Sequence, residues 1–188
     1  MHKAVLTLAR WMAVLGGLVL LALVLITCVS VAGRILNGWL HSDFLQGLIP
    51  GPADWLIGIG VGPLLGDFEL VEAGMAFAIF AFLPLCQITR GHASVDIFTS
   101  HMPAAFTRVI GVLVDFIFAA VLILIAQRLY VGTLDKMAFN ETTFMLQFPI
   151  WWAYGASLFA ATVAALVALY MALARLAGSL PDPGEVDL

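Results

Sequence analysis

The stretch "WMAVLGGLVLLALVLITCVSVAG", residues 11–33, contains no charged side chain and is dominated by leucine, valine and alanine. A helix needs about 20 predominantly apolar residues to cross the hydrocarbon core of a bilayer, and this run is long enough. Lys3 and Arg10 precede it, as basic residues precede the core of a signal peptide. The apolar run exceeds the roughly 7 to 15 residues of such a core, so we expect an uncleaved spanning helix.

The composition of the whole chain agrees with this first segment. Of its 188 residues, 63% are hydrophobic and 11% are charged, and the mean hydropathy is +1.07. Soluble domains carry about 25% charged residues, so the chain is expected to be an integral membrane protein. Three further runs are long and apolar enough to span, at residues 68–88, 105–131 and 150–174. We predict an all-α protein with four transmembrane helices in one domain, residues 1–175, and a mobile cytoplasmic tail, residues 176–188.

The first connection, residues 34–67, is too long and too apolar for a bare loop. We expect interfacial helical segments here, broken at "IPGP" and lying on the membrane or on a partner. Val95, Phe98 and Met102 recur at helical spacing and predict another short interfacial helix before the third span.

The distribution of basic residues predicts the orientation. Cytoplasmic connections carry an excess of lysine and arginine. With the N-terminus inside, the cytoplasmic segments hold Lys3, Arg10, Arg90, Arg108 and Arg175, and the outer ones hold Arg34, Arg128 and Lys136. This excess favours cytoplasmic N- and C-termini.

Several classes of function are not supported by the sequence. The net charge of −4 provides no basic field for nucleic acid. The chain has no GxxxxGK[ST], HExxH or GxSxG motif, and Cys28 and Cys86 lie in apolar segments at no metal-ligand spacing. The histidines fall in terminal or connecting segments, where they do not face one another to hold haem between spans. We therefore predict no catalytic residue, no cofactor and no metal site.

The acidic residues that open the second span have two interpretations. Asp67 and Glu69 are placed to complement the positive end of the helix dipole. Glu72 lies about one turn deeper on the face of Glu69. It either shares that role or pairs with a basic group on another helix or subunit.

Asp115 is the one carboxylate well inside a predicted span, about 15 Å from its cytoplasmic end at 1.5 Å per residue. An isolated acid makes a poor cation site without further oxygen ligands. We expect a structural hydrogen bond or a partner contact here, with a proton-carrying role as the alternative.

The segment "TRGHASVDIF" follows the second span and combines Arg90, His92 and Asp96. Arg90 suits the C-terminal end of a helix and the cytoplasmic border. His92 and Asp96 are four residues apart but lack a third ligand for a metal. These three residues are predicted to hold a membrane-border turn, and to contact a partner, without doing chemistry.

Four short-linked spans with this order of motifs resemble the small membrane subunit, DctQ type, of TRAP (tripartite ATP-independent periplasmic) transporters. The most specific part is the pattern GHxxVD, carried by Gly91, His92, Val95 and Asp96. The stretches "GDFELVE" and "NETTFMLQFPIWWAY" and the residue Arg34 also resemble the family. By this resemblance Arg34, Glu69, Glu72 and Glu141 join Arg90, His92, Asp96 and Asp115 as candidate structural or subunit-interface residues.

The resemblance implies a scaffold in the bacterial inner membrane. In such systems a large multi-span permease subunit carries the substrate with sodium, and a periplasmic substrate-binding protein delivers an organic acid. The small subunit would act as a stator within the lipid bilayer. Two alternatives remain from the residues: a haem- or quinone-binding anchor of a redox enzyme, and a small proton-coupled transporter that uses Asp115.

Overall fold

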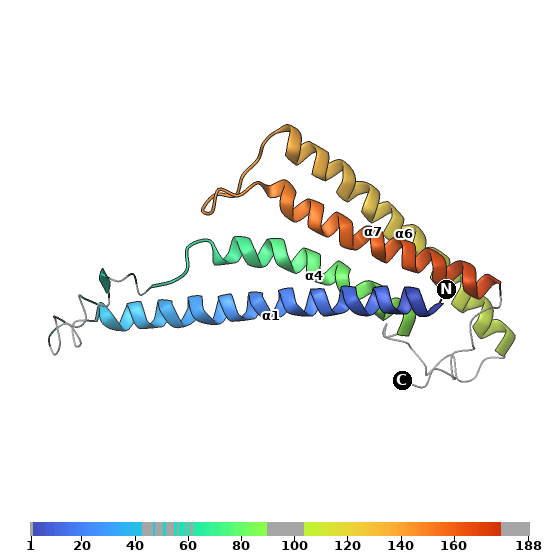
Figure 1. The fold of residues 1–188 in the computed structure, drawn as a ribbon, viewed down its shortest axis with the longest axis horizontal. Helices are drawn as coiled ribbons and strands as arrows, with labels where there is room; N and C mark the ends of the chain where they lie inside the picture. Colours follow the sequence, from blue (N-terminus) through green and yellow to red (C-terminus); the bar gives the residue numbers. More distant parts are fainter. Residues whose placement is uncertain are drawn as a thin grey trace.

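The computed structural model shows an all-helical chain (Figure 1). It describes residues 2–42, 47, 51, 55, 57–58, 60, 62–89 and 104–177, with the backbone alone at 104–108. The helices in these ranges are α1 (His2–Leu40), α4 (Asp67–Thr89), α6 (Ala104–Ala138) and α7 (Ile150–Leu176). Each is long and apolar enough to cross a membrane, which confirms the predicted fold class.

The helices are longer than the apolar runs that predict them. α1 begins at His2 and continues to Leu40, and α6 continues to Ala138. Hydropathy marks the part of a helix that suits hydrocarbon, whereas the backbone hydrogen bonds continue through polar residues of good helix propensity. Residues 34–40 therefore extend α1, which corrects their assignment to a separate interfacial segment.

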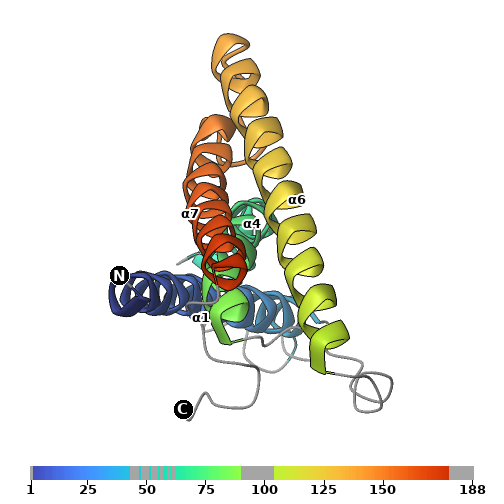
Figure 2. The same ribbon diagram turned by 90° about the vertical axis from the view of Figure 1, so that its right-hand side faces the viewer.

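The four helices form two pairs, α1 with α4 and α6 with α7, and α4 packs on α7 to join them. Figure 1 shows the pairs close together at the end that holds the N-terminus and further apart at the other end. Seen from that first end, α6 and α7 rise side by side above α1 (Figure 2), and α7 contacts both α6 and α4. Half of the most apolar window of α7 is buried, and less than a quarter in each of the other helices. α7 is therefore the central helix of the bundle.

Small side chains form most of the contact surfaces between helices. The Cβ that a side chain would add at Gly16 of α1 would lie 3.0 Å from the Cβ of Ala81 in α4. On α7, the buried residues are mainly alanines, among them Ala160, Ala164 and Ala168. Apolar burial drives little association inside a bilayer, so helices associate by close van der Waals packing, which small residues permit.

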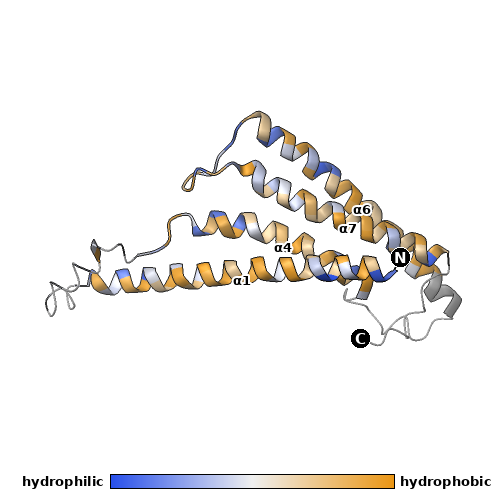
Figure 3. Cartoon of the chain, viewed as in Figure 1, coloured by the Kyte–Doolittle hydropathy of each residue, from blue (hydrophilic) through white to orange (hydrophobic). Residues whose placement is uncertain are grey.

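Large apolar side chains cover the outside of the bundle. Leu18 and Val29 of α1 and Ile117 and Leu124 of α6 are exposed. In Figure 3 the helices are mainly orange, with the strongly polar residues gathered toward the helix ends. Such a surface suits contact with lipid or with the apolar helices of another subunit.

Some sequence predictions fall on residues outside the described ranges. These are the break at "IPGP", the short helix before the third span and the tail from residue 178 onward. The candidate residues Arg90, His92 and Asp96 also lie outside the described ranges.

Candidate functional site

The connection between α6 and α7 forms a compact hairpin, residues 139–149, that folds back toward the start of α4 (Figure 1). Thr142 and Pro149 form an antiparallel bridge, and the N–H of Thr143 donates to the carbonyl of Phe148 at 3.0 Å. Asn140 and Gln147 turn the chain with φ of 49° and 57°. The left-handed region is most readily adopted by glycine and asparagine, so Asn140 suits its turn.

Glu69 holds the tip of this hairpin against α4. Its two carboxylate oxygens accept hydrogen bonds from the backbone N–H groups of Met145, at 2.7 Å, and Leu146, at 3.0 Å. The residue is only 6% exposed. Charge-assisted hydrogen bonds of this kind are about twice as strong as neutral ones. The sequence suggested that Glu69 complements its own helix end, but the structure places its oxygens on the neighbouring hairpin.

Gly66 makes this approach possible. Its φ is +78°, in the region that favours glycine, and a Cβ at this position would lie 2.6 Å from Cγ of Leu146. The residue that follows, Asp67, accepts a hydrogen bond at Oδ1 from the N–H of Phe68 at 2.9 Å. The start of α4 is thus shaped to receive the hairpin tip.

Glu141 connects the hairpin to α6. Its carboxylate forms an ion pair with Lys136 at 2.5 Å, and its carbonyl accepts from the N–H of Ile150 at 3.0 Å. Both side chains of the ion pair are partly exposed, so the pair itself contributes at most about 1 kcal/mol. The ion pair ties the start of the hairpin to α6, and the backbone hydrogen bond from Ile150 holds the two ends of the hairpin together.

A cavity of about 470 Å³ lies between the first turns of α4, the hairpin and α7. Glu72 lines it from α4, one turn beyond Glu69, and Ser157 lines it from α7. Ser157 is 2% exposed, and its hydroxyl has no hydrogen-bond partner among the described residues. The remaining lining is mainly apolar or aromatic, with Phe68, Phe144, Phe148, Ile150 and Tyr154 among its members.

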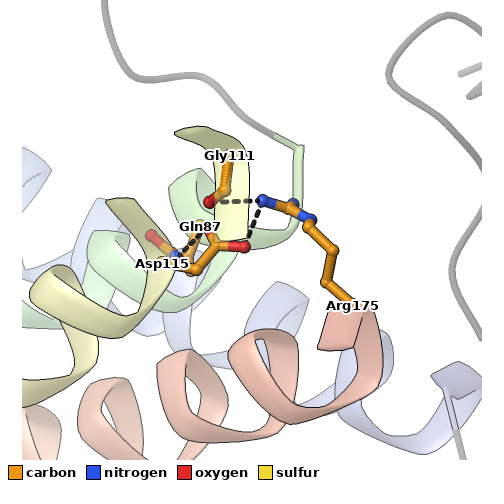
Figure 4. Close-up of polar contacts among 4 residues, drawn as sticks. All are labelled: Gln87, Gly111, Asp115 and Arg175. Carbon is orange, nitrogen blue, oxygen red and sulfur yellow. Dashed lines mark hydrogen bonds and ion pairs between the residues drawn. The ribbon is translucent and has the colours of Figure 1, made fainter. Parts of the chain in front are cut away.

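A second polar cluster lies at the opposite end of the bundle, where Asp115 of α6 forms an ion pair with Arg175 of α7 (Figure 4). The Arg175 guanidinium also donates from Nη1 to the carbonyl of Gly111 at 3.3 Å. Gln87 of α4 donates from Nε2 to Oδ1 of Asp115 at 3.4 Å. The Asp115 and Arg175 side chains are only 9% and 11% exposed, so this buried cluster ties α4, α6 and α7 together.

Asp115 lies well inside α6, but the residues that contact it lie at the ends of other helices. In space, the first turns of α6 extend past the last turn of α7 (Figure 1, Figure 2). Asp115 therefore lies beside the last turns of α4 and α7, although it is about 16 Å along α6 from the first residue of that helix. The sequence contained a signal for its partners: Gln87 and Arg175 both stand in the last polar turns of helices that end on this side.

The remaining candidates have weaker contacts. Arg34 is exposed on α1 and attracts the carboxylate of Asp67 electrostatically. Among the residues that the structure describes, no group of three or more histidine, cysteine, aspartate or glutamate side chains could hold a metal ion.

The chain matches the model of a known protein family. The family model described as "Tripartite ATP-independent periplasmic transporters, DctQ component" matches residues 59–178, which include α4, α6, the hairpin and α7. Searches among curated proteins and among solved structures gave no match. The family match spans more than half of the chain and both polar clusters. The chain therefore belongs to the DctQ family and is a small permease subunit of a tripartite ATP-independent periplasmic transporter.

Proposed function

We propose that this chain is the scaffold subunit of a secondary importer of organic acids driven by the sodium gradient. It acts in the bacterial inner membrane, beside a large multi-span permease subunit that carries the substrate. A periplasmic substrate-binding protein delivers the organic acid to the complex. Membership of the DctQ family is the observation that carries this proposal.

The bonding partners of the buried carboxylates support a scaffolding role. Glu69 binds the hairpin backbone, and Asp115 pairs with Arg175, so both buried carboxylates hold elements of this chain together. A transport site near the middle of the membrane requires polar groups that can exchange partners with the substrate or ion. Close packing through alanine and glycine suits a rigid body against which another subunit moves.

The arrangement of the ion pair disfavours a proton carrier at Asp115. Arginine stays charged in proteins. Protonating Asp115 would therefore leave the Arg175 guanidinium buried opposite a neutral group, which is costly. The described histidines, His2 and His41, lie at opposite ends of α1, too far apart to hold one haem together.

Reconstitution tests the proposal. Proteoliposomes that contain this subunit and the large permease subunit, supplied with the binding protein and an inward sodium gradient, are expected to accumulate an organic acid. Proteoliposomes that contain this chain alone are expected to show no uptake above empty liposomes. The physical reason is that the buried carboxylates Glu69 and Asp115 are bonded to other parts of this chain and do not form a site for a substrate or ion.

Two controls make the test specific. Dissipating the sodium gradient with an ionophore should abolish accumulation. Imposing a proton gradient in its place should not restore accumulation. Uptake by the isolated chain would overturn the scaffold assignment. Uptake by the large subunit and binding protein at the full rate, without this chain, would contradict it equally.

A further inference from the structure

The cavity between α4, the hairpin and α7 presents two polar side chains for which the described residues provide no partner. Glu72 is exposed one turn inside α4 and makes no ion pair or hydrogen bond within the described ranges. Ser157 is buried, yet its hydroxyl is unpaired in the described structure. Thr162, on the same helix, instead donates to the carbonyl of Leu158 at 2.8 Å. The lone hydroxyl of Ser157 therefore points to a ligand from outside.

No lysine or arginine among the described residues forms an ion pair with Glu72. The lining of the cavity includes no lysine or arginine. At this end of the bundle, Lys136 pairs with Glu141, Arg34 attracts Asp67, and Arg128 lines a different pocket, between α6 and α7. These described cations are thus engaged or placed elsewhere.

The undescribed segments do not supply a cation either. The sequence contains no lysine or arginine from residue 35 to residue 89, nor from residue 176 to the end of the chain. Arg90 follows the far end of α4, roughly 25 Å along the helix from Glu72 at 1.5 Å per residue. Arg108 belongs to the first turns of α6, at that same far end. We therefore expect a cation for Glu72 to come from another molecule.

The chemistry of the cavity favours a polypeptide as the source. A carboxylate exposed within an apolar helix is costly in hydrocarbon, and such groups pair with a cation on a neighbouring helix. The apolar and aromatic lining fits the side chains of a membrane helix. Because Glu69 fixes the hairpin, this wall of the cavity is ordered before the partner arrives, which reduces the entropic cost of binding.

We infer that a lysine or arginine of the large permease subunit enters this cavity, pairs with Glu72 and donates a second hydrogen bond to the hydroxyl of Ser157. The inference rests on the proposed function, since it requires the large subunit as a partner. It assigns the surface formed by α4, the hairpin and α7 as an interface within the transporter.

Co-purification of the tagged small subunit with the large permease subunit, from cells that express both, tests the inference. Glu72→Gln removes the charge at nearly constant size and should weaken the complex at least about tenfold, because the partner's cation is left unpaired. Ser157→Ala removes one hydrogen bond and should weaken it severalfold. The matched control is Asp135→Asn, which neutralises an exposed carboxylate of α6 outside the cavity and should leave association unchanged.

Charge exchange identifies the partner residue. In the Glu72→Lys background, changing the lysine or arginine of the large subunit that contacts the cavity to glutamate should restore co-purification. Each variant should first show wild-type helix content and a single elution peak, so that loss of binding is separated from misfolding. Equal association of the Glu72→Gln and Asp135→Asn subunits with the large subunit would overturn the inference.

Two further outcomes separate this inference from its alternatives. If the wild-type subunit fails to co-purify with the large subunit, the proposed function fails; if it co-purifies and Glu72→Gln has no effect, only the inference fails. Native mass spectrometry of the isolated subunit in phosphatidylethanolamine and in phosphatidylglycerol nanodiscs tests a lipid occupant. Glu72-dependent retention of the amine-bearing lipid, with assembly unaffected by Glu72→Gln, would show that the cavity binds lipid, and would contradict the inference.

Discussion

The ion pair between Asp115 and Arg175 is a buried interaction whose two partners depend on each other. Both side chains are about one-tenth exposed, and Gln87 and the carbonyl of Gly111 provide further hydrogen bonds. Removing one member of such a pair leaves an uncompensated charge. Replacing both members with apolar residues of similar volume is often neutral, because the desolvation of both charges is then avoided.

This reasoning gives a prediction for the residue scale. Asp115→Leu should lower the free energy of unfolding by on the order of 3 kcal/mol, because the Arg175 guanidinium loses its counter-charge. The double variant Asp115→Leu with Arg175→Met should recover most of that loss. Unfolding free energies of the detergent-solubilised subunit, measured as a double-mutant cycle, test the coupling.

The control for this cycle is Asp135→Ala, at an exposed position of α6, which should change stability by no more than about 0.5 kcal/mol. Additive effects of Asp115→Leu and Arg175→Met would show that the two side chains do not stabilise each other. Asp115→Asn is a milder change, because its amide oxygen can still accept from Gln87. It should therefore leave sodium-driven uptake by the assembled complex intact.

At the scale of elements, the hairpin between α6 and α7 acts as a clamp on α4. Its contacts near the start of α4 include the two hydrogen bonds to Glu69 and the close approach of Leu146 to Gly66, the residue before the helix. The tip leaves Phe144 88% exposed, so its position does not come from apolar burial of that side chain. The glutamate therefore determines where the tip lies.

Glu69→Gln should release this tip. The amide keeps one acceptor oxygen but turns an NH₂ group toward the second backbone N–H, so one charge-assisted hydrogen bond is lost and one weakened. Hydrogen exchange at Met145 and Leu146 should accelerate about tenfold or more, corresponding to the 1.5 to 3 kcal/mol of a hydrogen bond to a charged group.

The N–H of Ile150, bonded to the carbonyl of Glu141, is an internal reference for that experiment and should exchange at nearly the wild-type rate. Asp67→Asn is the matched variant. The described backbone N–H that Asp67 accepts from is in the start of its own helix and not in the hairpin. Unchanged exchange at Met145 and Leu146 in Glu69→Gln would show that the hairpin is held by other contacts.

The existence and type of the elements could be predicted from the sequence, whereas their exact ends and their pairing could not. The apolar runs identify four helices because a bilayer imposes a minimum length on them. The extension of α1 through Arg34 to Leu40 was missed, since hydropathy falls where the backbone remains helical. The contact of Glu69 with Met145 and Leu146 joins residues far apart in the chain, and no local pattern encodes such a pairing.

The candidate site shows the same division. The acidic nature of the α4 start and the isolation of Asp115 in its own helix were visible in the sequence. Arg175 meets Asp115 because of the register between α6 and α7. The packing of alanines such as Ala164 and Ala168 sets this register. This register follows from three-dimensional packing rather than from helical periodicity alone.

At the scale of the whole molecule, charge is distributed between the two ends of the bundle. The N-terminus of α1 and the C-terminal end of α7 lie at the same end (Figure 1), with Lys3, Arg10 and Arg175 in or near them. The hairpin end carries Arg34, Arg128 and Lys136, but also Asp67, Glu69, Glu72, Asp135 and Glu141. Lys136 is paired with Glu141 at the hairpin end and Arg175 with Asp115 at the other end. Among the described residues the hairpin end thus carries net negative charge, whereas Lys3, Arg10 and Arg175 against Asp115 leave net positive charge at the end that holds the N-terminus.

This asymmetry predicts that the end that holds the N-terminus and the last turn of α7 faces the cytoplasm. Labelling of single cysteines by a membrane-impermeant maleimide tests it, after Cys28 and Cys86 are changed to serine to remove the native thiols. Phe139→Cys, in the exposed turn before the hairpin bridge, should react in intact cells. Lys3→Cys and Glu185→Cys should react only after the membrane is permeabilised. Reaction of Glu185→Cys in intact cells, with Phe139→Cys protected, would require the inverse orientation, and the cavity beside Glu72 would then face the cytoplasm instead of the compartment from which the binding protein delivers its substrate.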